Sequence, residues 1–297
     1  FRRVLFRSTG FGSNNVDHCT RLCHASSVAA LLEGVGSGAV SNQVNDIEHS
    51  GLILLIGSNP TANHPVAATW MKNAAKNGTK IVLADPRVTD IGKYAWRTLQ
   101  FKPDTDVAML NAMIYTVIEE GLCDQDFIQN RASNFEALKE NVKGYSPEAM
   151  APICGIPAET LREVAREFAK SKASMILWGM GVSQHVHGTD NARCLIALVS
   201  ITGQIGKPGS GLHPLRGQNN VQGASDAGLI PMMFPNYQRV DNPDAHEWFE
   251  KFWNSPLDKK PGYTVVEIMH KITASDSDPD KIRGMYIMGE NPAMSDP

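Results

Sequence analysis

The sequence has little of several features that would assign it quickly to a class of protein. No apolar run approaches the roughly 20 residues of a bilayer-spanning helix, since Leu52 to Ile56, for example, is only five residues long. Charge of one sign is also lacking, because 28 Lys and Arg stand against 31 Asp and Glu, a net charge of -3. Nucleic acids and membrane surfaces attract proteins through basic patches. We therefore expect no nucleic-acid partner and no direct membrane insertion.

Cysteine is scarce, and the five present are scattered and odd in number. They are Cys19, Cys23, Cys123, Cys154 and Cys194. A chain of 297 residues with 42% hydrophobic content can bury a full core and needs no disulfide framework. The cysteine pattern predicts a reducing compartment, and the cytoplasm is the expected location. The sequence also lacks internal repeats and low-complexity tracts, which excludes a solenoid.

The ends of the sequence predict a fragment of a longer protein. The chain does not begin with Met, and residues 1–8 resemble translated adaptor sequence, so we leave them out of the fold prediction. We interpret residues 1–18 as a leader and the start of a second α/β domain. Residues 219–297 continue that domain and reach a strand-like segment, Gly284 to Met288, before the sequence stops.

What the sequence does contain is a recurring pattern of apolar strand, polar loop and helix. Leu52 to Ile56 is continuous and bounded by glycines, as is typical of a strand buried on both faces of a parallel sheet. Further strands are predicted at 80–84, 97–101 and 174–178, and helices at 66–76, 107–120, 157–170, 190–202, 245–253 and 264–272. The pattern predicts an α/β fold with a doubly wound, mainly parallel, Rossmann-like sheet over residues 19–218.

Polar residues follow each predicted strand, where a parallel sheet gathers its ligand sites along one edge. The candidates for nucleotide binding are Asn59, Asp85, Arg87, Asp106, Gly179, Gly181 and Gln184. The loop after the first strand is not Gly-x-Gly-x-x-Gly, so an ordinary dinucleotide site is not expected. Asp106 has an alternative role as the cap of the helix predicted from Val107.

One short loop, Arg21-Leu22-Cys23-His24-Ala25-Ser26, places a thiol beside an imidazole. A helix is predicted to start just after it, with Ser26 or Ser27 as cap, and a helix N-terminus favours the thiolate. Cys23 is therefore a candidate metal ligand or reactive thiol, with a buried core cysteine as the alternative. A zinc site made by His18, Cys19, Cys23 and His24 is disfavoured, because near-consecutive ligands strain tetrahedral geometry.

A second unusual stretch, residues 206–223, consists mainly of Gly, Pro, amides and basic residues. Four side-chain amides follow Arg216 closely: Gln218, Asn219, Asn220 and Gln222. Two interpretations stay open. The stretch is either a buried polar wall against a ligand, in which every donor and acceptor is satisfied, or an Asn-rich turn.

Taken in order, these stretches resemble the catalytic subunit of molybdenum- or tungsten-dependent formate dehydrogenases, within the bis-molybdopterin guanine dinucleotide oxidoreductases. The resemblance covers residues 12–297. The motifs that carry it are Arg21 to Ser26, Gly57 to Pro60 with His64-Pro65, Asp85-Pro86-Arg87, Gly179-Met180-Gly181 and Pro214 to Ala224. It implies oxidation of formate to carbon dioxide by two electrons at the metal centre, in a nucleotide-binding domain of residues 19–218.

The resemblance also implies roles for particular residues. Cys23 would be the thiolate ligand of the metal, and His24, Arg216 and Gln218 would be catalytic. The planar fork of Arg216 can hold both oxygens of formate, and a histidine that changes charge near neutral pH can take up a proton. Hydride transfer from formate and proton abstraction by His24 both stay open. Related nitrate reductases have the cysteine without this His or this Arg loop, which favours formate.

The family further implies a 4Fe-4S cluster in the full-length protein, although the four upstream cysteines that would bind it are absent from this chain. Iron-sulfur and NAD- or ferredoxin-linked electron-transfer subunits are the implied partners. We expect the fragment alone to be inactive. The alternatives are a nitrate reductase-like oxidoreductase of the same superfamily and a cofactor-free structural subunit of a respiratory complex.

Overall fold

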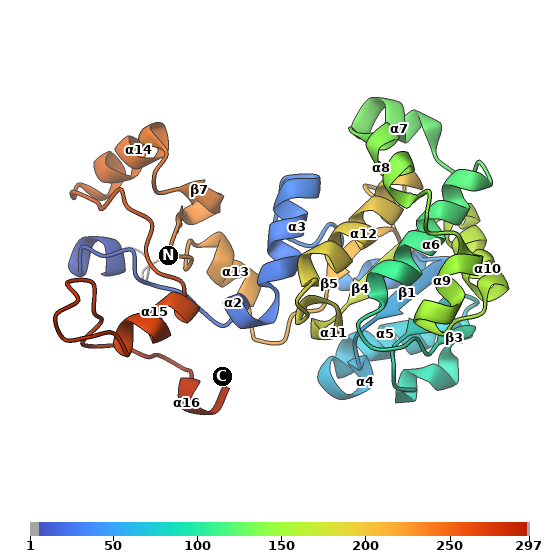
Figure 1. The fold of residues 1–297 in the computed structure, drawn as a ribbon, viewed down its shortest axis with the longest axis horizontal. Helices are drawn as coiled ribbons and strands as arrows, with labels where there is room; N and C mark the ends of the chain where they lie inside the picture. The colour runs from blue at the N-terminus through green and yellow to red at the C-terminus, as the bar shows by residue number, and fades with distance from the viewer. Residues whose placement is uncertain (1–5, 296–297) are drawn as a thin grey trace. The chain divides into compact units, whose positions relative to one another are not determined.

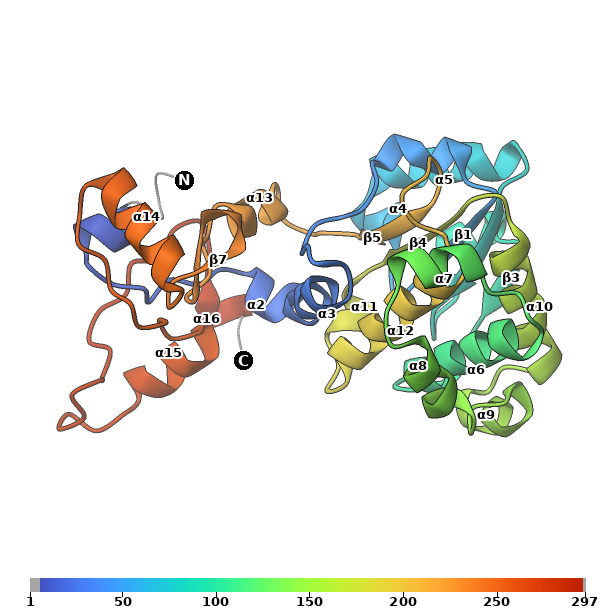
Figure 2. The same ribbon diagram turned by 90° about the horizontal axis from the view of Figure 1, so that it is seen from above.

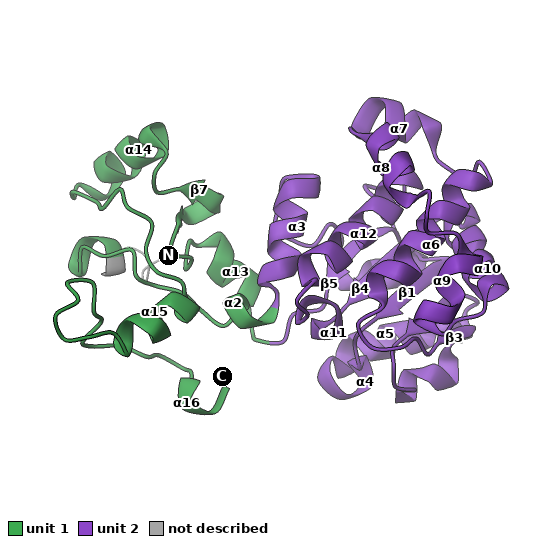
Figure 3. Ribbon diagram, in the orientation of Figure 1, with its two compact units in different colours: residues 1–23, 218–297 green, residues 24–217 purple. Residues whose placement is uncertain are grey.

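The computed structural model describes residues 6–295 and divides into two compact units. One contains the residues up to 23 together with those from 218 onward, and the other contains residues 24–217 (Figure 3). The limits of the second unit lie close to those predicted for the nucleotide-binding domain. The assignment of domains by function stays a prediction, and the part of the leader at residues 1–5 lies outside the described residues.

The unit of residues 24–217 is built on a parallel sheet, which has five strands within the described chain. The strands are β1 Leu52–Ile56, β2 Lys80–Ala84, β3 Arg97–Leu99, β4 Ser174–Trp178 and β5 Gly211–Pro214, in the order β3-β2-β1-β4-β5. All neighbours pair in parallel, so every carboxyl end lies at the same edge. The strand order reverses between β1 and β4, which is where doubly wound folds bind ligands. The predicted fold class is confirmed.

Strand β5 was not predicted from the sequence. Its four residues include Gly211, His213 and Pro214, which have low strand propensity. It is nevertheless held by its pairing with β4, and it lies at the edge of the described sheet, where a proline is tolerated. Arg216, interpreted from the sequence as part of a polar loop, therefore lies two residues after a strand end.

Helices cover both faces of this sheet (Figures 1 and 2). Ile53 and Leu55 pack into the core on one face, whereas Leu52, Leu54 and Ile56 pack into the core on the other. Successive strand side chains point to opposite faces, and because both faces are covered, β1 is apolar throughout. The first face carries α5 Pro65–Lys76 and the 3-10 helix η2 Val44–His49, and the second carries α3 Ala25–Val35, α6 Asp106–Glu119, α10 Ala158–Lys170 and α12 Gly188–Ile201.

The start of α3 differs from the sequence prediction. The helix begins at Ala25, and His24 is its N-cap without a side-chain capping hydrogen bond. Ser26 and Ser27 therefore lie inside the first turn, and neither is the cap. Their hydroxyls point to other elements: Ser26 Oγ donates to the Ser183 carbonyl at 3.0 Å, and Ser27 Oγ accepts from Trp178 Nε1 at 2.8 Å.

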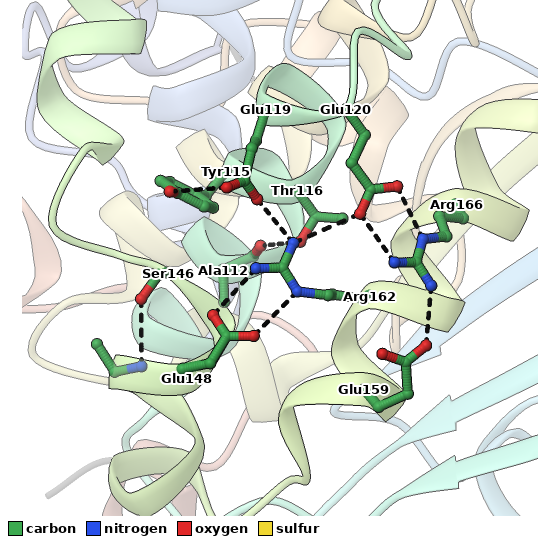
Figure 4. A network of polar contacts seen from close by, with 11 residues as sticks. Ala112, Tyr115, Thr116, Glu119, Glu120, Ser146, Glu148, Glu159, Arg162 and Arg166 are labelled. Carbon is green, nitrogen blue, oxygen red and sulfur yellow. Dashed lines mark hydrogen bonds and ion pairs between the residues drawn. The ribbon is translucent and has the colours of Figure 1, made fainter.

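The remaining elements of this unit are short. They are α4 Pro60–Asn63, η3 Asp90–Tyr94, α7 Gln125–Arg131, α8 Phe135–Val142, α9 Pro147–Cys154 and α11 Met180–Ser183. Two arginines of α10, Arg162 and Arg166, join α6, α9 and α10 through a network of ion pairs (Figure 4). Their carboxylate partners are Glu119, Glu120, Glu148 and Glu159. A connected network with forked arginine contacts stabilises more than isolated surface pairs do.

The other unit contains short helices and, among its described residues, one small antiparallel pair of strands, β6 Met233–Phe234 and β7 Gln238–Arg239. Phe234, Val240 and Phe249 form its apolar cluster. Its other elements are the π-helix η1 Phe6–Gly10, α2 Thr20–Cys23, α13 Val221–Asp226, η4 Pro235–Tyr237, α14 Pro243–Trp253, α15 Val265–Ile272 and α16 Pro292–Ser295. The helices predicted at 245–253 and 264–272 are confirmed as α14 and α15.

The strand predicted at Gly284 to Met288 is wrong. These residues form no strand, and Tyr286 is 72% exposed. A strand needs a hydrogen-bonded neighbour, and none of the strands within residues 6–295 pairs with this segment. Among the described residues, no helix is both long enough and apolar enough to cross a membrane.

Candidate active site

The carboxyl edge of the five-stranded sheet carries most of the residues predicted to bind a cofactor. Loops after β1, β2, β3 and β4 and the segment after β5 all emerge there. The fold therefore brings together residues far apart in sequence: Asn59, Asp85, Arg87, Asp106, Gly179, Gly181, Gln184 and Arg216. Cys23 and Gln218 are assigned to the other unit, each at a point where the chain passes between units.

Three glycines bring the loops after β1 and β4 into backbone contact. Gly57 has φ +57°, and a Cβ there would lie 2.7 Å from the carbonyl carbon of Gly181. A Cβ on Gly179 would lie 2.6 Å from the Gly57 carbonyl oxygen, which also accepts the Gly181 N–H at 3.0 Å. These distances are too short for any side chain. The three glycines therefore allow the loops after β1 and β4 to approach each other closely. A contact between these glycines and a cofactor stays a prediction.

Asp106 is the most unusual polar side chain at this edge. It is 1% exposed, and neither carboxylate oxygen has a hydrogen-bond partner within the described residues. The N-cap of α6 is Thr105, so the alternative role of Asp106 as a cap is not found. Burial raises the pKa of the carboxyl, and the nearby charge of His185 lowers it. Buried carboxylates normally have donors, so Asp106 fits a ligand that supplies N–H groups.

The other edge residues have roles in turns or are exposed. Asp85 is buried, and its Oδ1 accepts the Arg87 N–H at 2.8 Å. Asn59 Oδ1 accepts from Thr61 Oγ1 at 2.7 Å. Such contacts are typical of Asp and Asn in turns. The side chains of Arg87 and Gln184 are exposed at the same edge, where they remain accessible to a ligand.

His24 is fully buried behind the end of β5. Its Nε2 lies 3.0 Å from the Leu215 carbonyl oxygen, which can only accept, so Nε2 carries the hydrogen. Its Nδ1 then accepts from the hydroxyl of Ser27 or Ser183, at 3.2 and 3.1 Å. Burial, followed by the charge of Arg216, lowers the pKa of His24 to about 4. The sequence-based expectation that His24 changes its charge near neutral pH is therefore wrong for the described chain.

Two more histidines lie close to Arg216. His64 Nε2 is 2.6 Å from the Arg216 carbonyl oxygen. His213 is buried, its Nδ1 is 2.6 Å from Asn42 Oδ1, and burial lowers its pKa to about 4. The guanidinium of Arg216 donates from Nη2 to the Gly38 carbonyl at 2.9 Å. Arg216 is therefore held through both its main chain and its side chain.

These buried histidines predict a loss of stability in weak acid. The unfolded chain takes up protons near the ordinary histidine pKa of 6.5, whereas the fold keeps His24 and His213 neutral down to about pH 4. Lowering the pH through that window therefore favours the unfolded state, by up to about 3 kcal/mol for each histidine. Urea unfolding at pH 7 and pH 4.5 should show this loss. His213→Asn keeps an N–H donor but cannot titrate, and it should remove about half of the loss of stability between pH 7 and pH 4.5.

The exposed His187→Asn is the matched control for that series, and it should leave the pH dependence unchanged. A His213→Asn variant with the full wild-type loss of stability would show that His213 does not contribute.

The amide-rich stretch after Arg216 does not form a buried wall. Gln218, Asn219 and Asn220 are exposed, and Asn220 has a left-handed backbone, with φ 53°, at the start of α13. Asn is one of the few residues that adopts this conformation readily. The structure therefore supports a turn for these three residues, and a catalytic role for Gln218 stays a prediction.

Cys23 is buried at the end of α2, and it directly precedes His24, the N-cap of α3, as the sequence predicted. Its N–H donates to the Cys19 carbonyl at 3.1 Å. Among the residues that the structure describes, no group of three or more His, Cys, Asp and Glu side chains is placed to hold a metal ion. The zinc alternative therefore loses its support. A single thiolate suits a metal whose other ligands come from a cofactor.

Sequence reasoning missed His64 and His213 as neighbours of Arg216. Pro65 gives a local signal for His64, because proline at the first helical position places the preceding residue at the N-cap. No such signal shows that this N-cap lies against the end of β5. The contact joins residues 152 positions apart.

Comparison with known proteins gives a consistent family. The family described as "Molybdopterin oxidoreductase" matches residues 3–297. The chain is 43% identical over 292 residues to the F420-dependent formate dehydrogenase subunit alpha of Methanocaldococcus jannaschii, covering 98% of this chain and 42% of that protein. It is 41% identical over 292 residues to formate dehydrogenase H of Escherichia coli, covering 98% and 40%.

A solved structure, acetylene hydratase from Pelobacter acetylenicus, matches with a TM-score of 0.61 and 29% identity, over 65% of this chain and 26% of that one. The chain spans about two fifths of the length of the two curated formate dehydrogenase relatives.

Proposed function

The chain belongs to the molybdopterin oxidoreductase family, and from this premise we propose that it is part of the catalytic subunit of a formate dehydrogenase. The full-length protein would oxidise formate to carbon dioxide with the release of two electrons and one proton. The observation that carries the proposal is Arg216, a guanidinium fixed at a strand end beside a buried neutral histidine that directly follows Cys23. The names of relatives at 41–43% identity support the same substrate.

The described residues fit a bis-molybdopterin guanine dinucleotide cofactor. The buried carboxylate of Asp106 lacks donors, and a guanine base presents two adjacent N–H groups that a carboxylate can accept. Arg87 offers an exposed guanidinium, suited to phosphate, and Cys23 offers one thiolate. When bound, the cofactor would supply a molybdenum or tungsten centre that accepts two electrons. The choice of guanine dinucleotide, and of either metal, is part of the proposal.

The substrate role falls on Arg216. Formate is a one-carbon carboxylate, and a planar guanidinium can hold both its oxygens and fix the direction of its C–H bond. His24, with its hydrogen on Nε2, supports the Leu215 carbonyl and thereby the residue that binds formate. If its Nδ1 took up a proton, the hydroxyls of Ser27 and Ser183 would have to turn from donating to accepting. Gln218 would add an amide donor near the substrate.

The electrons need an acceptor outside the described residues. We propose a 4Fe-4S cluster in the full-length protein, and iron-sulfur or NAD- or ferredoxin-linked subunits as partners. A relative named as F420-dependent supports a dedicated electron acceptor. A cytoplasmic location is part of this proposal.

The experiment that tests the function uses the full-length protein, expressed with molybdenum and tungsten supplied. Metal analysis should find one of the two metals, and formate should reduce an artificial dye. Metal together with nitrate reduction but no formate oxidation would support the nitrate reductase-like alternative. Absence of both metals would support a cofactor-free structural subunit.

The cofactor assignment predicts opposite effects of Asp106→Asn on binding and stability. The amide loses one of two acceptors for the guanine N–H groups, so the guanine nucleotide released from the purified full-length protein should fall several-fold. The melting temperature of the cofactor-free chain should stay the same or rise by a few degrees, because an unpaired buried carboxylate is removed. The exposed Asp126→Asn is the control. Unchanged nucleotide content would contradict the role of Asp106.

A further inference from the structure

Two consecutive carbonyl groups at the end of β5 each accept a hydrogen bond from a different histidine. The Leu215 oxygen lies 3.0 Å from His24 Nε2, and the Arg216 oxygen lies 2.6 Å from His64 Nε2. These two carbonyls belong to the peptide groups on either side of the Arg216 Cα. Because each peptide group is planar, fixing both carbonyls fixes the backbone dihedrals of Arg216 and the direction of its Cα–Cβ bond, and the contact of Nη2 with the Gly38 carbonyl holds the far end of the side chain.

His64 is itself held rigidly. Its N–H donates to the Pro60 carbonyl at 2.9 Å, and its carbonyl accepts from the Ala68 N–H at 2.9 Å. It is at once the C-cap of α4 and the N-cap of α5. A side chain anchored between two helix ends is a firm support for the strand end.

The two ring nitrogens of His64 have different surroundings. A carbonyl can only accept, so Nε2 carries the hydrogen that binds Arg216. Nδ1 is buried and has no hydrogen-bond partner among the described residues. Within the described chain, the hydrogen bond from the His64 ring to Arg216 therefore runs through Nε2, and a substitution can test the two nitrogens separately.

The segment after Arg216 gives no comparable support. Gly217 is exposed, and a Cβ placed on it would meet nothing within 4 Å. The chain passes into the other unit at the next peptide bond. Without the His64 contact, the Arg216 carbonyl would belong to this unsupported segment.

We propose that His64 is a positioning residue for Arg216, whose Nε2–H fixes the Arg216 carbonyl and holds the guanidinium in the direction that binds formate. The proposal rests on the proposed function, in which Arg216 binds the substrate. His64 acts through the main chain of Arg216 and not on the substrate itself.

A matched pair of variants in the full-length protein tests the role of each nitrogen. His64→Gln places an amide N–H close to the position of Nε2, whereas His64→Asn replaces Nδ1 and reaches no further. His64→Asn should raise the KM for formate about tenfold, with a smaller fall in kcat, because loss of one hydrogen bond reorients a binding group. His64→Gln should restore KM to within about threefold of the wild type. His187→Asn is the exposed control.

A double-mutant cycle shows whether His64 acts through Arg216. In an Arg216→Ala background, His64→Asn should cause no further rise in KM, because the group that it positions is gone. A full additional tenfold loss in that background would overturn the proposal. So would a wild-type KM for His64→Asn, or a KM for His64→Gln as high as that of His64→Asn.

Hydrogen exchange separates failure of this inference from failure of the proposed function. The Leu215 N–H donates to the Trp178 carbonyl at 2.8 Å, so its exchange rate reports opening of the strand end. His64→Asn should speed amide exchange over residues 215–217 about tenfold, and His64→Gln should not. If the wild type failed to oxidise formate, the proposed function would fall, while this measurement would still decide whether His64 holds Arg216. Equal exchange in all three proteins would overturn the inference.

Discussion

Replacing Cys23 with serine in the full-length protein should lower formate-dependent dye reduction by at least about a thousandfold. The thiolate is the form of cysteine that binds a metal, and a serine hydroxyl does not ionise at neutral pH. Cys23 is the single protein ligand that we propose, so the substitution removes the entire contribution of the chain to the coordination of the metal. Metal analysis and dye reduction on the same preparation measure the effect.

Cys19→Ser is the matched control, because Cys19 lies one helical turn away. Burial, followed by the charge of Glu290, raises the pKa of the Cys19 thiol, which makes it a poorer ligand. This control should keep both metal and activity. A Cys23→Ser protein that retains wild-type turnover would remove Cys23 from the metal centre, whatever its metal content.

Arg216→Ala should lower kcat/KM for formate by about a thousandfold while the metal content stays unchanged. A charged forked contact to a carboxylate contributes both binding and orientation, and orientation of a reacting C–H bond has large effects on rate. Arg216→Lys should recover part of the loss, because an ammonium supplies charge without the planar fork. Steady-state kinetics with formate give kcat/KM for both variants.

Arg131→Ala, at the exposed end of α7, is the control for that series. It should leave the kinetics unchanged. Equal values of kcat/KM for the wild type and Arg216→Ala would show that formate binds elsewhere.

The sequence was sufficient to predict the central strands of the sheet. Strands β1, β2 and β4 lie at the predicted residues because strands buried on both faces need continuous apolar runs, and glycine or polar residues mark their ends. β5 could not be predicted in the same way. Gly211 to Pro214 are extended because they pair with β4, a contact that local propensity does not contain.

The candidate site was predictable in its position but not in its contacts. The rule that ligand-binding residues follow parallel strands placed Asp106 at this edge of the sheet, whereas Arg216 was singled out by its polar stretch and by the family resemblance. This rule gives no information on how deeply each side chain is buried. The pKa of His24 differs from the expected value because the ring is buried and lies near the charge of Arg216. Its enclosure involves Leu215 and Ser183, from distant parts of the chain, as well as the nearby Ser27. The support of Arg216 by His64 is missing from the prediction for the same reason.

The close contact between Gly57, Gly179 and Gly181 limits how this site can be altered. A side chain at any of these positions would collide with main-chain atoms, which cannot move aside as another side chain can. Substitutions intended to change the preference of the proposed nucleotide site therefore have no room between β1 and β4. New specificity has to come from the residues that follow β2 and β3, where Arg87 is exposed and Asp106 is the first residue of a helix. Libraries built on this scaffold should vary those positions and keep the three glycines constant.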